Sequence, residues 1–420
     1  MKTRWFFVAG SIMIVLALMA LPASAMAGQV NVLRVGPGEQ YATIQEAVNA
    51  ANQGSRILVY PKPGDYTEYV LVNKNNLQFI AQGTGVVVRP PDLMPGQDPA
   101  NSSPGGFLII ADHVTIRGFN IGFGGGCRPA IEFRGSYNTL ADNYIYQAQS
   151  CLGITAVLGR TPDGGAGYNT YERNTISHAE TGIFLGSEAI DSLSTGDVVR
   201  DNIITQIVSW PIGIENSVGV LVSGNYIDGT SGGPCISVDA LDGTTLPQGQ
   251  HTIVKNTLQG CVVGISLNAG PGTVMTNNRI AENTIENCGA NCVALYAGSG
   301  AMLTNNQISS NRISASFGAN GIALQVEGGI VSGNLILDNI IFDNFLNGIF
   351  LWPGANDNRI FNNDVRTNNL AAVAGAAGIT VAGDSNLIVG NIAQGNKVQD
   401  LLDLGQGNRW VNNTYGTKTP

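Results

Sequence analysis

Two carboxylic acids, Glu215 and Asp239, stand 24 residues apart in the sequence, each beside a short apolar segment. A pair of carboxylates about 6 to 10 Å apart spans the range that an inverting glycoside hydrolase uses for its acid and its base. Glu215 and Asp239 are therefore candidates for a catalytic pair. Two acids on a long acidic surface also reach such a spacing by chance, so both interpretations stay open.

A further acid close to Asp239 suggests a different chemistry. The segment DALDG carries Asp239 and Asp242, and a hard cation such as calcium takes several oxygen ligands. These two carboxylates could contribute to a calcium site, although the twelve-residue pattern of a dedicated calcium loop is missing. We expect no required cofactor, and a bound calcium ion is possible.

The elements that must position these side chains follow from an internal repeat. A second marker, Gly-Ile-x-Leu, recurs between repeated Asn residues, as in GIFL at 182–185 and GISL at 264–267. Alternation with a period of two, interrupted by Gly and Asn, indicates short strands. The Asn-x-apolar phrase recurs at steps of 22 to 31 residues, at Asn120, Asn143, Asn174, Asn202, Asn225, Asn256, Asn283, Asn311, Asn339, Asn363, Asn391 and Asn413.

A repeat of this size predicts a stacked coil. Each unit buries too little apolar surface to stand alone, so neighbouring units must share one continuous core. Three short parallel strands per turn need roughly 20 to 30 residues, in agreement with the observed steps. We expect the Asn side chains to lie at the same bend in every turn and to hydrogen-bond along the stack.

Residues 35–413 resemble the right-handed parallel β-helix superfamily typified by pectin and pectate lyases. The resemblance includes the opening stretch ATIQEAVNAANQGSRILVYPKPGDYTEYVLV, which implies an amphipathic capping helix at 44–51 and then the first coil. It implies an all-β fold, a right-handed parallel β-helix solenoid of about a dozen coils with an N-terminal capping helix. The expected segments are a signal peptide at 1–27, a cap and first strand at 28–60, the β-helix at 61–413 and a C-terminal tail at 414–420.

The resemblance also implies where a site would lie, namely on the outer face of the first strand of each coil. There Glu215 and Asp239 would occupy adjacent coils without facing each other directly. Exposed aromatic side chains on a rigid strand could stack on sugar rings, or they could pack beneath neighbouring loops. The expected substrate-binding residues of this face are Glu132, Arg134, Phe184, Ser237, Asn268, Tyr296, Phe350 and Trp352.

The six cysteines follow the same one-coil spacing. In a parallel β-helix this spacing implies two stacked disulfides, Cys127–Cys151 and Cys235–Cys261, with a local Cys288–Cys292 loop. Adjacent strands lie about 4.8 Å apart, close to the Cα separation of about 5.5 Å that a disulfide needs. Free buried thiols are the alternative.

The amino terminus and the charge indicate compartment and partners. Basic residues precede an apolar run at 5–21 and then small residues, the order of a secretory signal, with cleavage at 25 or 27 and an uncleaved anchor as the alternative. Removing Lys2 and Arg4 takes the net charge from −9 to −11. We therefore expect a secreted protein, in the periplasm, at the cell surface or outside the cell. Its acidic surface disfavours nucleic acid, and we expect no membrane contact after cleavage.

Two functions remain in competition, and both involve contact with a polysaccharide or cell-surface glycan. The first is a polysaccharide lyase, epimerase or hydrolase, favoured by the outward acids and aromatics and by long loops after the first strand. The second is a non-catalytic structural or adhesion protein of the cell surface. It is favoured by the low histidine count and by the absence of the Gly-His-Gly and Asp-Pro-His-Glu motifs of polygalacturonases and alginate epimerases. The assembly state is not predicted.

Overall fold

The computed structural model describes residues 30–91, 106–122, 129–146, 155–161, 167–187, 192–230, 232–244 and 246–419. The expected signal peptide at 1–27 and two of the cysteines, Cys127 and Cys151, lie outside these residues. Within the described part of the chain, no helix is long and apolar enough to cross a membrane.

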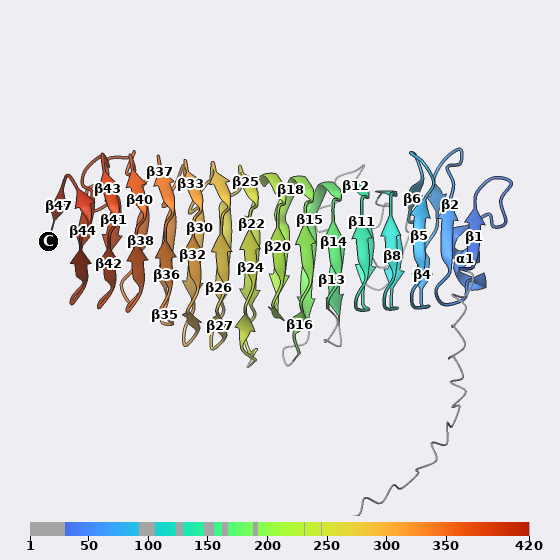
Figure 1. Cartoon of the computed structure of the whole chain (residues 1–420), viewed down its shortest axis with the longest axis horizontal. Coiled ribbons are helices and arrows are strands. Elements are labelled where there is room, and N and C mark those ends of the chain that lie inside the picture. Colours follow the sequence, from blue (N-terminus) through green and yellow to red (C-terminus); the bar gives the residue numbers. More distant parts are fainter. Residues whose placement is uncertain are drawn as a thin grey trace, which may run out of the picture. The chain divides into compact units, whose positions relative to one another are not determined.

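Short parallel strands wind into successive coils, and each coil contributes one strand to each of three sheets. In Figure 1 the strands follow one another in sequence order from β1 to β47. The first sheet carries the Gly-Ile-x-Leu markers and consists of β4 (Val70–Val72), β7 (Phe107–Ile109), β10 (Ile131–Phe133), β13 (Thr155–Thr161), β15 (Thr175–Ser187), β18 (Ile203–Glu215), β22 (Pro234–Ala240), β26 (Val263–Ala269), β30 (Val293–Ala297), β34 (Ile322–Val326), β38 (Ile349–Leu351), β41 (Ile379–Val381), β44 (Leu401–Asp403) and β47 (Lys418–Thr419).

The second sheet has 15 strands within the described residues. They are β1 (Val32–Val35), β2 (Arg56–Val59), β5 (Gln78–Ala81), β8 (Thr115–Arg117), β11 (Thr139–Ala141), β14 (Thr170–Glu172), β17 (Val198–Arg200), β20 (Leu221–Ser223), β24 (Thr252–Val254), β28 (Arg279–Ala281), β32 (Gln307–Ser309), β36 (Leu335–Leu337), β39 (Arg359–Phe361), β42 (Leu387–Val389) and β45 (Arg409–Val411).

The third sheet shares β15 and β18 with the first, because these two long strands run through the corner between the sheets. Its other strands are β3 (Tyr66–Thr67), β6 (Val87–Arg89), β9 (Asn120–Gly122), β12 (Tyr144–Tyr146), β21 (Tyr226–Thr230), β25 (Thr257–Gln259), β29 (Thr284–Glu286), β33 (Arg312–Ser314), β37 (Ile340–Phe342), β40 (Asp364–Arg366), β43 (Ile392–Gln394) and β46 (Thr414–Tyr415).

Within the described parts of the chain, a small fourth sheet of six strands occupies the segment between the first and second sheets on the central coils. Its strands, some of which Figure 1 labels on the edge opposite β12, β25 and β33, are β16 (Ser194–Thr195), β19 (Ser217–Val218), β23 (Gln248–Gly249), β27 (Val274–Thr276), β31 (Met302–Thr304) and β35 (Ile330–Ser332).

The core lies inside the coils and confirms the predicted alternation. The Ile of each Gly-Ile-x-Leu marker faces its counterpart in the next coil, as Ile183 faces Ile212 and Ile212 faces Ile236. These side chains are completely buried, as is Leu185 two positions further along. Burying one large aliphatic side chain stabilises the fold by about 1.5–3 kcal/mol. This contribution is repeated in every coil and holds the stack together.

The predicted Asn ladder lies at the bend between the second and third sheets. In each rung the side-chain amide donates to the Oδ1 of the next Asn, for example from Asn283 to Asn311 at 3.0 Å and from Asn311 to Asn339 at 2.9 Å. The same amides also donate to backbone carbonyls, as Asn283 does to Ile253 at 2.9 Å. The ladder thus satisfies polar groups that the bend buries.

One predicted rung of this ladder is wrong. Asn120 is the first residue of β9 and pairs with Tyr144 of β12, so it is displaced by one residue from the ladder. Phe119 holds the equivalent place, and its backbone N–H donates to Oδ1 of Asn143 at 3.0 Å. The ladder therefore begins at Asn143.

Helix α1 (Ile44–Ala50) confirms the helix expected at 44–51. A capping box starts it: Thr43 accepts from the N–H of Glu46, and the Glu46 carboxylate accepts from the N–H of Thr43. Glu68 also accepts from the N–H of Ile44 at 2.9 Å. The helix buries its apolar side against β1, β2 and β4, and its role as a cap stays a prediction.

Two predicted disulfides are confirmed. Cys235, in β22, pairs with Cys261, just before β26, with a Cα separation of 5.5 Å. Cys288 pairs with Cys292 at a Cα separation of 5.4 Å. At the carboxyl end, β46 pairs with β43 and β47 pairs with β44. The stack thus continues through residues 414–419, where the sequence suggests a tail.

Candidate functional site

The outward side chains of the first sheet form two rows, two residues apart along the strands. The Ser237 row contains Phe184, Gly213, Ser237, Ser266, Ala294, Ala323, Phe350 and Thr380. The Asp239 row contains Gly186, Glu215, Asp239, Asn268, Tyr296 and Gln325.

The register corrects the expected relation between the two acids. Glu215 of β18 and Asp239 of β22 are direct partners across adjacent strands, instead of being offset. The sequence suggests an offset because Pro211-Ile212 takes the place of Gly-Ile in this coil. Residues of neighbouring parallel strands lie about 4.8 Å apart, so the two carboxylates start from closer backbone positions than expected.

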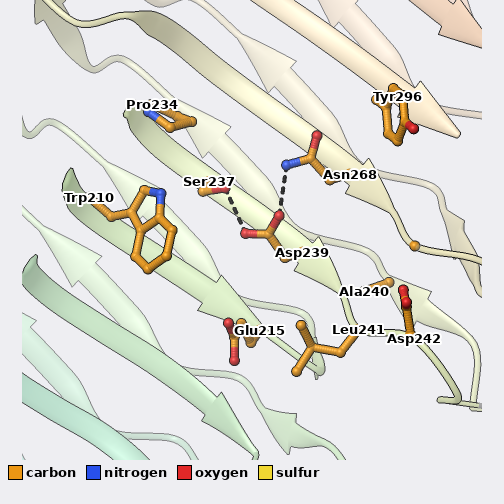
Figure 2. A pocket seen from close by; sticks show the side chains of 11 residues that line it. Trp210, Glu215, Pro234, Ser237, Asp239, Ala240, Leu241, Asp242, Asn268 and Tyr296 are labelled. Atoms are coloured by element: carbon orange, nitrogen blue, oxygen red, sulfur yellow. Dashed lines mark hydrogen bonds between the residues drawn. The ribbon is translucent and has the colours of Figure 1, made fainter. Parts of the chain in front are cut away.

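A pocket of about 400 Å³ surrounds this pair on β18, β22, β26 and β30. Figure 2 shows Asp239 between Ser237 and Asn268, with Glu215 on the neighbouring strand. The lining includes six residues singled out from the sequence, Glu215, Ser237, Asp239, Asp242, Asn268 and Tyr296, together with Trp210, Pro234, Ala240, Leu241 and Gly270.

A short hydrogen-bond chain fixes the Asp239 carboxylate. The Ser237 hydroxyl donates to one oxygen at 2.6 Å, and the Asn268 amide donates to the other at 2.7 Å. The Ser266 hydroxyl donates to Oδ1 of Asn268 at 2.8 Å, which orients that amide. Burial raises the pKa of Asp239, and the two hydrogen bonds oppose this rise in part. A carboxyl with a raised pKa is suited to hold and deliver a proton.

Aromatic side chains stand on both sides of the carboxylates. Trp210 precedes Glu215 on β18 and is 39% exposed. It stacks on Phe184 with a centroid distance of 6.1 Å and an interplanar angle of 27°. At the other end, the Tyr296 hydroxyl hydrogen-bonds Glu327, which raises the pKa of Tyr296.

Phe184, expected to contact substrate, is only 8% exposed. Its ring covers Gly213, where a Cβ would lie 2.5 Å from Phe184 Cδ2. Phe184 therefore supports Trp210 from beneath. The sequence does not single out Trp210, because this residue precedes the apolar marker of its coil and is marked only by the SWP triplet ahead of Ile212.

Other expected substrate-binding residues lie elsewhere on the first sheet. Glu132 and Arg134, at β10, form an ion pair at 2.6 Å, and β13 and β15 separate them from β18. Phe350 and Trp352 lie at β38 with ring centroids 6.0 Å apart, beyond β34 as seen from Tyr296. The expected substrate-binding residues thus form three separate clusters on the first sheet, and the central cluster contains the pocket around Asp239.

The suggested calcium ligands both line the pocket. Asp242 is exposed, and Asp239 already accepts two hydrogen bonds. In the described ranges, no three His, Cys, Asp or Glu side chains come together as a metal-holding group. A calcium ion there would need further oxygen ligands, and the site stays a prediction.

Comparisons with known proteins agree with this architecture. The family model described as "Right handed beta helix region" matches residues 212–414. The chain is a right-handed parallel β-helix. A search of curated proteins finds no significant match to this β-helix sequence.

Solved structures with the same fold act on or bind carbohydrates according to their names. A complex of XylC with xylose is 13% identical, covers 91% of this chain and 86% of its own, and has a TM-score of 0.52. The A-module of the Azotobacter vinelandii mannuronan C-5 epimerase AlgE4 is 12% identical, covers 90% and 94%, and has a TM-score of 0.50. A mutant tailspike protein of E. coli bacteriophage HK620 in complex with a pentasaccharide is 12% identical, covers 87% and 71%, and has a TM-score of 0.59. At such identities the likeness concerns the fold alone.

Proposed function

We propose that this β-helix binds a polysaccharide along the outer face of its first sheet, with the pocket around Asp239 as the central subsite. The observation that carries the proposal is the combination of an exposed Trp210, the tethered Asp239–Asn268 pair and Tyr296 around one hollow. A sugar ring offers apolar C–H faces to an aromatic side chain and hydroxyl groups to carboxylates and amides. A volume of about 400 Å³ suits one or two sugar units.

The charge of the lining favours a neutral glycan. Glu215, Asp239 and Asp242 are the charged residues among the described side chains around the pocket, and all three are acids. A uronate unit would meet like charges there unless a cation lay between them. Neutral hexose or pentose polymers are therefore the preferred substrate class.

Substitution of Trp210 tests the binding proposal. We expect Trp210→Ala to weaken binding of a neutral trisaccharide at least tenfold in calorimetric titration. The matched control is Trp352→Ala, which removes the same kind of side chain directly after β38, beyond the reach of a trisaccharide held at β18. Equal binding by the wild type and Trp210→Ala would refute the central subsite.

Hydrolysis is the second candidate function, and the direct pairing of Glu215 with Asp239 favours it. Asp239, with its raised pKa, would donate its proton to the leaving oxygen while the Glu215 carboxylate attacks the anomeric carbon and the glycosidic C–O bond breaks. A water molecule deprotonated by Asp239 would then displace Glu215 and release the sugar. Retaining enzymes hold their two carboxyl groups roughly 5–5.5 Å apart and inverting ones about 6.5–9.5 Å apart, and directly paired residues on adjacent strands suit the shorter separation. We therefore expect retention of configuration at the anomeric carbon.

Product analysis separates the enzyme from a non-catalytic binding protein. Reducing ends released from a bound glycan should disappear in Asp239→Asn, while trisaccharide binding persists. Nuclear magnetic resonance of the first product would give its anomeric configuration. Binding without turnover on every bound glycan would instead support a structural or adhesion role at the cell surface.

We further propose that the chain is exported. The expected signal sequence at 1–27 and the Cys235–Cys261 and Cys288–Cys292 disulfides support this location, since disulfides persist mainly outside the cytoplasm. Fractionation of cells expressing the full chain, with mass determination of the mature amino terminus, tests it.

A further inference from the structure

A second hollow lies on the third sheet, on a different face from the pocket around Asp239. Its volume is about 470 Å³, within the range of about 300–1,000 Å³ of small-molecule sites. It lies across β12, β15, β18 and β21, and its lining includes Tyr144, Ser177, His178, Thr205, Gln206 and Asp228.

The hollow forms where two long strands turn from the third sheet into the first. His178 of β15 and Gln206 of β18 have positive φ values of 59° and 54°, which bend both strands at the same level. Gly229 follows at that level in the next coil, and a Cβ built on it would meet nothing within 4 Å. The bend and the missing side chain leave the space open.

Ser177 supplies the observation that points to a ligand. Its side chain is only 5% exposed, and its hydroxyl has no hydrogen-bond partner among the described residues. A buried polar group without a partner carries a penalty of about 1–3 kcal/mol. This oxygen is almost inaccessible in the described conformation, so a ligand hydroxyl in the hollow would remove the penalty by drawing the Ser177 hydroxyl round to face it.

The other lining groups suit a polyol. Ser177, Thr205 and Asp228 face one another across β15, β18 and β21 and present two hydroxyls and one carboxylate in a row. The Tyr226 hydroxyl donates to Asp228 at 3.4 Å and accepts from the Gln259 amide at 2.8 Å, so the carboxylate is held from outside the hollow.

Tyr144 adds an aromatic surface at the rim. It is 41% exposed and stacks on Tyr146 with a centroid distance of 5.0 Å. Neither Lys nor Arg occurs among the described residues that line the hollow, so an anionic ligand would find no permanent positive charge there. Hydroxyls, an amide, one carboxylate and an aromatic ring together match a neutral sugar unit.

We propose that this hollow on the third sheet is a second saccharide-binding site, which takes a neutral sugar unit. It does not depend on the function proposed for the first sheet, because none of its described lining residues belongs to the pocket around Asp239. The β-helix would thus hold glycan on two faces, and the two sites overlap at the coil of β18.

The experiment uses the full chain with the first-sheet pocket disabled by Trp210→Ala and Asp239→Ala together. Maltose, cellobiose, lactose and xylobiose are the probes, followed by saturation-transfer nuclear magnetic resonance and calorimetric titration. We expect at least one disaccharide to bind this background protein. Adding Ser177→Ala or Asp228→Asn should weaken that binding at least fivefold.

Two positions in the same row of the third sheet provide matched controls. Ser314, also 5% exposed, and Glu286 continue the row of Ser177 and Asp228 at β33 and β29. Ser314→Ala and Glu286→Gln should leave disaccharide binding unchanged. Ser177→Ala should not lower the thermal midpoint, because it removes a hydroxyl that the fold leaves unpaired.

The proposal is overturned if none of the four disaccharides binds the background protein, or if Ser177→Ala and Asp228→Asn bind as tightly as the background. A third outcome would also overturn it: the protein binds calcium but no sugar, and Asp228→Asn abolishes the calcium binding. The hollow would then be a cation site. Failure of the first-sheet proposal would appear separately, as unchanged binding in Trp210→Ala alone.

Discussion

Two buried titratable residues, Asp197 and His251, lie at the corner that leads into the second sheet. Asp197 accepts from the backbone N–H of Asn169 at 2.8 Å and from the Ser194 hydroxyl at 2.9 Å, and burial raises its pKa to about 7. His251 accepts at Nδ1 from the N–H of Val220 at 3.2 Å, and burial lowers its pKa to about 4. Other coils have a neutral Asn at this corner, for example Asn278 and Asn306. Because Asp197 and His251 are buried there, we expect each to prefer its uncharged form.

Asp197→Asn should therefore stabilise the protein in a pH-dependent way. Between the ordinary Asp pKa of about 3.9 and the folded value of about 7, the folded state holds a proton that the unfolded state has lost. The contribution of Asp197 to stability is thus present below pH 4 and is lost as the pH rises through 7.

We expect the Asn variant to unfold at higher denaturant concentration, with a gain on the order of 1 to 4 kcal/mol at pH 8 and little gain at pH 4. Urea titrations of both proteins at several pH values measure this difference in the free energy of unfolding. His251 is present in both proteins, so its contribution drops out of the difference. A gain that did not vary with pH would contradict the assignment.

The bend between the second and third sheets depends on the Asn ladder as an element. Asn283, in the middle of the stack, donates to Ile253 O and Asn311 Oδ1, and its Oδ1 accepts from the N–H and the amide of Asn256. Each rung therefore ties three successive coils, and a single side chain serves as both donor and acceptor.

Asn283→Ala should destabilise the fold by about 2–5 kcal/mol, since four hydrogen bonds are lost and buried backbone groups remain unpaired. Thr284→Ala is the control, because Thr284 follows directly in β29 and is only partly buried. Thermal unfolding monitored by circular dichroism compares the two. Similar midpoints for both variants would show that the ladder contributes little.

The two disulfides should differ in their effect on stability. Cys235–Cys261 closes a separation of 26 residues, whereas Cys288–Cys292 closes one of 4 residues. On the chain-entropy account, the longer loop restricts the unfolded chain more and contributes roughly 3 kcal/mol.

We expect the double variant Cys235→Ala, Cys261→Ala to unfold at a clearly lower urea concentration than Cys288→Ala, Cys292→Ala. Parallel titrations under oxidising conditions make the comparison. The reverse order would indicate that native packing around the cysteines, and not loop closure, sets their contribution.

At the scale of the whole molecule, one strand connects the two candidate sites. β18 contributes Trp210 and Glu215 to the first-sheet pocket and Thr205 and Gln206 to the hollow on the third sheet. Both sites are acidic, and the full chain carries a net charge of −9. Repulsion from this charge should act on any polyanionic glycan that approaches either face.

Polygalacturonate should therefore bind at least tenfold more weakly than a neutral polysaccharide in the presence of EDTA. Millimolar calcium should raise its affinity if Asp239 and Asp242 help to hold a bridging cation. Sodium chloride at matched ionic strength separates this effect from screening. Tight binding in EDTA would contradict the charge argument.

The sequence by itself determined the coil. The period-two alternation and the repeated Asn predicted which side chains point inward, as at Ile183 and Leu185, and the one-coil spacing implied the Cys235–Cys261 pair. These features could be predicted because every coil repeats the same strands and the same Asn bend. One misread coil therefore does not alter the pattern.

Only the tertiary structure decided which outward side chains meet. Pro211 at a Gly position concealed the register that sets Glu215 opposite Asp239, and Trp210 lay ahead of any marker. The third-sheet hollow depends on left-handed backbone at His178 and Gln206, which alternation does not encode. The physical reason is that side-chain direction is a local property of a strand, whereas contact across coils depends on corners and loops of variable length.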